Sequence, residues 1–322
     1  MSGEDLILSL YNVCKRLNDI INVYPRYQFL ETNSTITSMS FMHNRIGSEG
    51  AKYLATILET NTAITELYFS HENIGEDGAK HLANVLKSNT TLTNLTLESD
   101  NIGSKGAYNL AQALRINRTL TDLNLERNRI GNTGARHFAR ALNQNTTLTS
   151  LNFSRKNLDA QKFQQLVKFL GTNATITSMS FMHNRIGSQG AKYLAIILER
   201  NTAITTLYFS HENIGEDGVK HLANVLKTNM TLTNLTLEDD NIGSRGAYSL
   251  AQALRINMTL TDLNLERNRI GNTGARHFAR ALNQNTTLTI LNITNNDIDD
   301  HLEERLFDKF NRSYQRVYSS ND

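Results

Sequence analysis

The amino-acid sequence predicts a right-handed α/β solenoid, in which a parallel β-sheet lines the concave side and helices cover the convex side. Three observations predict this fold class: a repeat of 28 residues, a change of apolar period inside each repeat, and no Pro-rich or Gly/Ser-rich linker. Self-similarity at such a period is the signature of stacked repeats. The repeat has the frame L-x-x-L-x-L-x-x-N-x-I-G-x-x-G-A-x-x-L-A-x-x-L. Its first apolar position occurs ten times, at Ile36, Ile64, Leu92, Leu120, Leu148, Ile176, Ile204, Leu232, Leu260 and Leu288.

Each repeat is expected to contain one strand followed by one helix. Leu95 and Leu97 alternate with polar residues, as in a strand with one buried face. The apolar residues that follow have the helical spacing i, i+3, i+4 and i+7, at Ala107, Leu110, Ala111 and Leu114. Strands lie about 4.8 Å apart in a sheet, whereas packed helices need about 8–10 Å. The stack is therefore expected to curve into a horseshoe with the sheet inside.

Two polar residues stand where these helices should begin. Ser104 and Asn132 are predicted N-caps, because their hydroxyl or amide oxygen can accept from a first-turn amide. The glycines two residues later, Gly106 and Gly134, are predicted to let the helix pack close to the strand.

Residues 92–114, LTNLTLESDNIGSKGAYNLAQAL, resemble the leucine-rich repeat family. They are most similar to its ribonuclease-inhibitor-like subclass, which also occurs in NOD-like receptors and in Ran GTPase-activating proteins. Ten in-phase copies cover residues 36 to about 310. The resemblance implies a horseshoe whose relatives inhibit enzymes, sense ligands or scaffold complexes.

The family's asparagine ladder, which satisfies buried turn backbone groups, maps onto the N of L-x-L-x-x-N. This position holds Asn44, Asn128, Asn184, Asn268 and Asn296, but it holds Glu72, Asp100, Lys156, Glu212 and Asp240 in the other repeats. A carboxylate accepts hydrogen bonds and cannot donate them. We therefore expect the turn to shift in those repeats and to use the neighbouring Asn73 or Asn101.

The sequence is also duplicated at a larger scale. Residues 31–149 and 171–289 align with an offset of 140, and 13 of the 119 positions differ. The predicted organisation is one continuous solenoid domain: an N-terminal helical cap at 1–35, repeats 1–5 at 36–175, repeats 6–10 at 176–299 and a C-terminal capping helix at 300–322. The fifth and tenth repeats lack the IGxxGA glycines, so the seam at 150–173 is the expected weak point of the stack.

Composition limits the function classes. Lys and Arg number 33 against 31 Asp and Glu, which is too balanced for a dedicated nucleic-acid binder. There is no transmembrane run, which argues against a membrane protein, and the N-terminus has no basic leader. The single cysteine, Cys14, favours a reducing compartment. We expect a monomer in the cytoplasm, or in a host cytoplasm if the protein is a delivered effector.

No catalytic or cofactor motif is present, so neither an enzyme nor a cofactor is predicted. His43 and His71 share one slot in adjacent repeats, as do His183 and His211. Each pair could hold a metal with Glu72 or Glu212, but no third and fourth ligand is evident, and solvated histidines are the favoured interpretation. The Asn-x-Thr sequons at Asn89, Asn94, Asn117 and Asn145 fit N-glycosylation or a structural connector, and we favour the connector.

The predicted binding surface is the concave face, where residues between the buried leucines point outward. Glu98, Asp122 and Glu126 are expected to cluster there, and Glu238, Asp262 and Glu266 to repeat the cluster. The surface is predicted to bind a protein with a basic segment. Its residues are Met42, His43, Glu66, Tyr68, His71, Glu98, Asp122, Glu126, Arg127, Met182, His183, Tyr208, His211, Glu238, Asp262, Glu266 and Arg267.

The predicted function is that of a non-enzymatic protein-interaction module, acting as a regulator, inhibitor, scaffold or host-directed effector. Two alternatives remain from other classes. One is a GTPase-activating protein of the Ran-directed type, although no matching catalytic set can be placed in this sequence. The other is an engineered repeat scaffold without a natural ligand, which the near-identical halves suggest.

Overall fold

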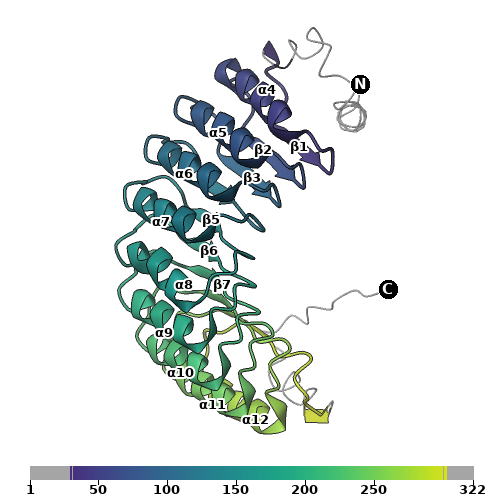
Figure 1. The fold of residues 1–322 in the computed structure, drawn as a ribbon. Helices are drawn as coiled ribbons and strands as arrows, with labels where there is room; N and C mark the ends of the chain where they lie inside the picture. Colours follow the sequence, from purple (N-terminus) through teal and green to yellow (C-terminus); the bar gives the residue numbers. More distant parts are fainter. Residues whose placement is uncertain (1–29, 31, 300, 303–322) are drawn as a thin grey trace. The chain divides into compact units, whose positions relative to one another are not determined.

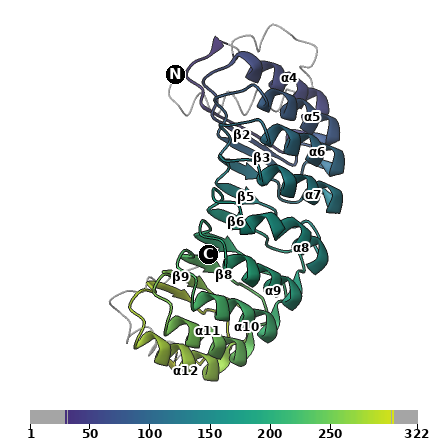
Figure 2. The same ribbon diagram turned by 90° about the vertical axis from the view of Figure 1, so that its left-hand side faces the viewer.

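The structure is a computed structural model, and it describes residues 30, 32–299 and 301–302. The chain divides into two compact units between Lys156 and Asn157, a boundary inside residues 150–173. Each unit is described by itself. In both, a parallel sheet forms one layer and helices form the other (Figures 1 and 2).

The first unit contains five strands and four helices among its described residues. The strands are β1 (Ser38–Met42), β2 (Glu66–Ser70), β3 (Asn94–Glu98), β4 (Asp122–Asn124) and β5 (Ser150–Asn152). The helices are α4 (Gly47–Thr60), α5 (Gly75–Leu86), α6 (Gly103–Leu114) and α7 (Gly131–Leu142). Neighbouring strands pair in parallel with a register of one repeat, so that Leu67 lies opposite Leu95.

The second unit begins with α8 (Ala160–Val167) and a 3₁₀ turn, η2 (Lys168–Gly171). Its strands are β6 (Ser178–Ser180), β7 (Thr206–Tyr208), β8 (Asn234–Thr236), β9 (Asp262–Asn264) and β10 (Ile290–Asn292). They alternate with α9 (Gly187–Leu198), α10 (Gly215–Leu226), α11 (Gly243–Leu254) and α12 (Gly271–Leu282). These strands are also parallel and in sequence order. The predicted α/β solenoid of ten strand-bearing repeats is confirmed.

The core lies between the sheet and the helices, as the two apolar periods predict. Leu95 and Leu97 of β3 are buried, and so are Leu110 and Leu114 of α6. Each fully buried leucine contributes about 1.5–3 kcal/mol. Phenylalanines fill the same layer in some repeats, for example where Phe41 stacks on the ring of the next repeat.

The predicted N-caps at Ser104 and Asn132 are wrong. Helices α6 and α7 begin at Gly103 and Gly131, and in this described stretch the preceding residue makes no side-chain capping bond. In other repeats, the first amide of the helix is satisfied by a main-chain carbonyl of the next repeat. For example, the Gly75 N–H donates to the Asp100 carbonyl over 2.9 Å. Repetition thus replaces side-chain capping.

The fifth repeat has no such glycine, and there a side-chain cap appears. Asp159 precedes α8 and accepts from the Lys162 amide over 2.9 Å.

The glycines two residues after the predicted caps make room for a helix, and not for a strand as predicted. A Cβ on Gly106 would lie 2.9 Å from Ala79 Cβ of the preceding helix and 2.5 Å from Ile102 Cγ2. A Cβ on Gly134 would lie 2.8 Å from Ala107 Cβ. These glycines therefore set the distance between successive helices.

The two predicted terminal caps lie outside the described residues, except for a few positions at their inner edges. Leu30, at the inner edge of the N-terminal segment, is buried. Within the described chain, no helix is both long enough and apolar enough to cross a bilayer.

Candidate functional site

The sheet of each unit has one face turned away from the helices, which we call the open face. In β2, Leu67 and Phe69 point toward the helices and are buried, while Glu66 and Tyr68 point the other way and are half-buried. The parallel register places equivalent residues of successive strands side by side. The open face therefore carries columns of side chains that run across the strands.

In the first unit, two glutamates and two arginines form ion pairs with one another, and we call this group the first carboxylate cluster. It consists of Glu98, Glu126, Arg127 and Arg155. Arg155 Nε lies 3.0 Å from Glu126 Oε1, and Arg127 lies 3.9 Å from Glu98 and 4.0 Å from Glu126. Two carboxylates thus face two guanidinium groups.

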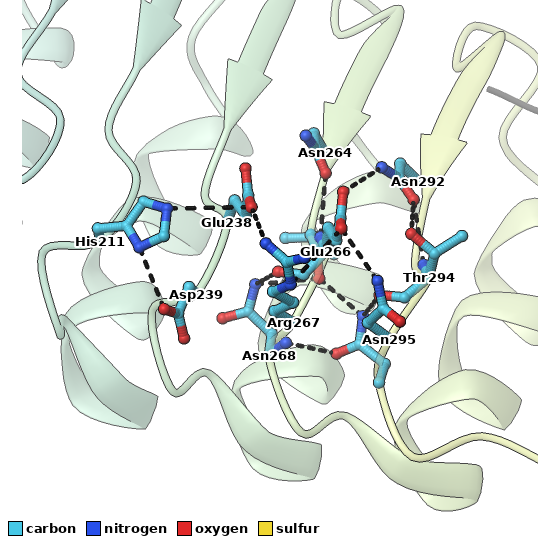
Figure 3. Close-up of polar contacts among 12 residues, drawn as sticks. His211, Glu238, Asp239, Asn264, Glu266, Arg267, Asn268, Asn292, Thr294 and Asn295 are labelled. Carbon is cyan, nitrogen blue, oxygen red and sulfur yellow. Dashed lines mark hydrogen bonds and ion pairs between the residues drawn. The ribbon is translucent and has the colours of Figure 1, made fainter. Parts of the chain in front are cut away.

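The second carboxylate cluster occupies the equivalent place in the second unit and consists of Glu238, Asp239, Glu266 and Arg267 (Figure 3). Arg267 lies 3.1 Å from Glu238 Oε1 and 3.7 Å from Glu266 Oε1. His211 Nδ1 lies 3.1 Å from Asp239 Oδ2 and its Nε2 lies 3.9 Å from Glu238. Amide groups of Asn292 and Asn295 donate to Glu266.

Two substitutions between the halves give these clusters different charges. Ser99 of the first unit is replaced by Asp239, and Arg155 is replaced by Asn295. The first cluster has two carboxylates and two guanidinium groups, so its formal charge is zero. The second has three carboxylates and one guanidinium group, so its formal charge is −2 with neutral His211.

The prediction that Asp122 clusters with Glu98 and Glu126 is wrong, and the same holds for Asp262 with Glu238 and Glu266. Asp122 lies opposite Asn94 and Ser150, at the start of β4 and four residues before Glu126, which follows that strand. Four residues of strand span about 13 Å.

Asp122 belongs instead to the column that contains Glu66. The Tyr68 hydroxyl donates to Glu66 Oε2 over 3.0 Å. Partial burial, this hydrogen bond and the charges of Glu66 and Asp122 together raise the pKa of Tyr68.

The predicted histidine pairs do come together. The rings of His43 and His71 stack with centroids 4.7 Å apart, and those of His183 and His211 stack 4.0 Å apart. Among the described residues, no group of three or more His, Cys, Asp and Glu side chains is arranged to hold a metal ion. Glu72, which we considered as a ligand, is buried and accepts main-chain hydrogen bonds.

Apolar side chains accompany the acids on the open face. Met42 is 55% exposed and Tyr208 is 41% exposed, which is high for such large side chains. Met182 is half-buried. The open face therefore offers charged groups beside aromatic and thioether groups.

The asparagine ladder lies behind this surface. Asn128 Oδ1 accepts from the main-chain amides of Asp100 and Ile102 at 3.1 Å. Its Nδ2 donates to the carbonyls of Leu97 and Leu125. Asn268 and Asn296 repeat this pattern. One amide group thus satisfies buried donors and acceptors of two repeats.

The predicted turn shift at the acidic ladder positions is wrong, because the carboxylates occupy the asparagine positions themselves. Glu72 accepts from the amides of Asn44 and Ile46 at 2.7 and 3.0 Å, and Asp100 Oδ1 accepts from the Glu72 amide at 2.7 Å. Glu212 and Asp240 do the same in the second unit.

Burial dominates the protonation of these ladder acids. Desolvation raises the pKa of Asp100 to about 7 and those of Glu212 and Asp240 to about 8, against the lowering effect of the amides that donate to them. The pKa of Glu72 is raised for the same reason. Lys156, also on the ladder, donates from Nζ to the Leu125 carbonyl, and burial lowers its pKa well below the usual value.

A second ladder was not predicted as a hydrogen-bond network. It is formed by the sequon-type asparagines between helix and strand, for example Asn117, whose Nδ2 donates to the Leu86 carbonyl at 2.8 Å and whose Oδ1 accepts from the Leu120 amide at 2.7 Å. The favoured structural interpretation of Asn89, Asn117 and Asn145 agrees with their burial. The available signal was an asparagine at the same repeat position in nine repeats: 61, 89, 117, 145, 173, 201, 229, 257 and 285.

Comparison with known proteins agrees with this fold. A family model described as leucine-rich repeat matches residues 32–55, 117–139, 172–195, 257–279 and 284–301. The chain is a leucine-rich repeat protein. A search of curated proteins gives no match.

Two solved structures are similar to this chain. The leucine-rich repeat-containing protein LegL7 from Legionella pneumophila has a TM-score of 0.62 at 16% identity, over 92% of this chain and 97% of that one. The leiomodin-1 actin-binding site 2 structure has a TM-score of 0.43 at 23% identity, over 48% of this chain and 89% of that one. At these identities, the likeness to LegL7 concerns the fold.

Proposed function

We propose that this protein is a non-enzymatic interaction module that binds a protein partner through its open sheet faces. The observation that carries the proposal is the second carboxylate cluster, where a net negative charge lies on the sheet face opposite to the described helices (Figure 3). Repeat solenoids use such extended faces for binding. Charge at the rim of an interface sets the choice of partner and the association rate.

The partner that fits best has a segment rich in Lys or Arg. The second cluster keeps an excess of two negative charges after its internal ion pairs, whereas the first cluster is neutral. We therefore propose that the second unit makes the main contact with the basic segment. Tyr208 and Met182 would contact apolar parts of the same partner, since aromatic side chains and methionine are enriched at interfaces.

The test measures binding of fluorescent Lys- and Arg-rich peptides and of charge-neutral peptides of the same length. The variant Glu238→Gln/Glu266→Gln removes two charges and keeps the side-chain shape. We expect its affinity for the basic peptides to fall by about tenfold, which corresponds to about 1.4 kcal/mol. The affinity of the wild type should fall as salt is added.

Two matched variants serve as controls. Glu98→Gln/Glu126→Gln changes the equivalent residues of the first unit and is expected to have a smaller effect. Glu59→Gln/Glu199→Gln removes two exposed carboxylates from the helical side and should leave binding unchanged. Equal loss in all three variants, or equal affinity for basic and neutral peptides, would contradict the proposal.

A further inference from the structure

Two buried carboxyl groups have an oxygen without a hydrogen-bond partner. Among the described residues, Asp100 Oδ2 and Asp240 Oδ2 are shielded from solvent and lack a donor. The other oxygen of each accepts a main-chain amide of the preceding repeat, at 2.7 and 2.8 Å. An unpaired buried polar atom is costly, so these two atoms call for a physical explanation.

The ladder indicates what these oxygens face. In Asn128, Oδ1 makes the same acceptor bond to the preceding repeat, and Nδ2 donates to the carbonyls of Leu97 and Leu125. By repeat equivalence, Asp100 Oδ2 stands where the amide nitrogen would be, among main-chain carbonyl oxygens. A deprotonated oxygen there has no donor among the described residues, whereas a protonated one can itself donate to a carbonyl.

We propose that Asp100 and Asp240 each hold a proton in the folded protein at mildly acidic pH, donate it to main-chain carbonyls in place of the asparagine amide, and thereby make the stability of both units depend on pH. The neighbouring charged groups favour the proton. Asp100 faces the carboxyl of Glu72, and Asp240 faces those of Glu212 and Asp239. The next ladder residue on the other side is a neutral asparagine in both units, Asn128 or Asn268.

The direction of the pH effect follows from proton linkage. The pKa of Asp100 is raised to about 7 and that of Asp240 to about 8, so the folded state binds more protons than the unfolded state between about pH 4 and these values. Stability is therefore highest at the acidic end of this window and is lost as the pH rises through the folded pKa values. Burial also raises the pKa of Glu72 in the first unit, against the lowering effect of the amides that donate to it and of nearby His43.

The experiment compares urea unfolding midpoints at about pH 5 and about pH 9. The variant Asp100→Asn/Asp240→Asn supplies a permanent donor at both positions. Its midpoint should fall less than that of the wild type on going to the higher pH, and it should exceed the wild-type midpoint there. Asp77→Asn/Asp217→Asn is the matched control, because it changes exposed aspartates in the same two halves. The control should keep the wild-type pH response.

A direct readout comes from the ¹³C shifts of aspartate carboxyl carbons in the full chain. The wild type should show two aspartates that titrate far above the usual range, one near about pH 7 and one near about pH 8, and both signals should be missing in Asp100→Asn/Asp240→Asn. The proposal is overturned if every aspartate titrates near about pH 4, or if the two double variants respond to pH alike. Neither measurement involves a binding partner, so the outcome is independent of the proposed function.

Discussion

At the scale of single residues, asparagine side chains hold the repeats together by joining main-chain groups of neighbouring repeats. Asn117 shows the principle: its Nδ2 donates to the Leu86 carbonyl of the preceding repeat, while its Oδ1 accepts from Leu120 in the next strand connection. The amide has a donor and an acceptor on one planar group. This explains why asparagine occupies this position in nine repeats.

Replacing Asn117 with Ala should therefore be strongly destabilising. The change leaves buried main-chain groups without partners, and each costs about 1–3 kcal/mol. We expect a loss of about 2–4 kcal/mol in the free energy of unfolding, measured by urea denaturation. Asn109→Ser, in the same repeat, is the control, because serine occupies the equivalent position 249 of the second unit. A loss no larger than that of the control would contradict the role assigned to Asn117.

At the scale of the element, the two glycines in the first turn of α7 have different structural roles. Gly131 has φ of +59° with open space where a Cβ would be, whereas Gly134 would place a Cβ 2.8 Å from Ala107 Cβ. Glycine is favoured at position 131 because the backbone there is in the left-handed region. Glycine is needed at position 134 because Ala107 of the preceding helix leaves no room for a Cβ. Both belong to α7, so they can be compared in one context.

Substitution by Ala and by Asn should distinguish the conformational role of Gly131 from the packing role of Gly134. At position 131, Ala should lower the free energy of unfolding by about 1–2 kcal/mol, because its backbone must adopt the left-handed conformation. Asn should lower it less, because it visits that region readily. At position 134, the cost is overpacking of about 1–3 kcal/mol, and the larger Asn should be worse than Ala. The prediction is thus opposite rank orders in thermal unfolding. The same order at both positions would contradict it.

The order of strands and helices could be predicted from the sequence because the two apolar periods of the repeat are strong and in phase. The helix starts were predicted wrongly because Ser104 and Asn132 have capping chemistry, but α6 and α7 begin one residue earlier, at Gly103 and Gly131, without a side-chain capping bond from the residue before them. In other repeats the first amide of the helix is bonded by the main chain of the next repeat, which a local pattern does not reveal. Asp122 was misplaced for a related reason. Its neighbours depend on the register of β4 against β3, and residues four apart on a strand do not meet.

At the scale of the whole molecule, duplication gives two similar units with different surface charge. Between residues 31–149 and 171–289 the strand apolar positions are identical, so the fold is preserved, while Ser99 becomes Asp239 and, beyond these residues, Arg155 gives way to Asn295. Both changes make the second cluster more negative. The sequence alone predicted acidic residues on this face, but the neutralising contacts of Arg127 and Arg155 required side-chain positions.

The stability of a stacked chain is a sum of repeat and neighbour contributions, so a repeat with weak local structure should open first. That repeat is the one containing α8, which has 8 residues where α9 has 12 and ends in a 3₁₀ turn. An eight-residue helix closes about four intrahelical hydrogen bonds, against about eight in a twelve-residue one.

Hydrogen exchange at neutral pH should therefore show the amides of α8 exchanging at least about tenfold faster than those of α9 and α10. Removing the cap by Asp159→Ala should cost about 1 kcal/mol and speed exchange in α8 further. The control Asp77→Ala, at an exposed position of α5, should leave α8 unaffected. Protection of α8 equal to that of α9 would contradict the prediction, because stability would then be spread evenly across repeats whose local structures differ.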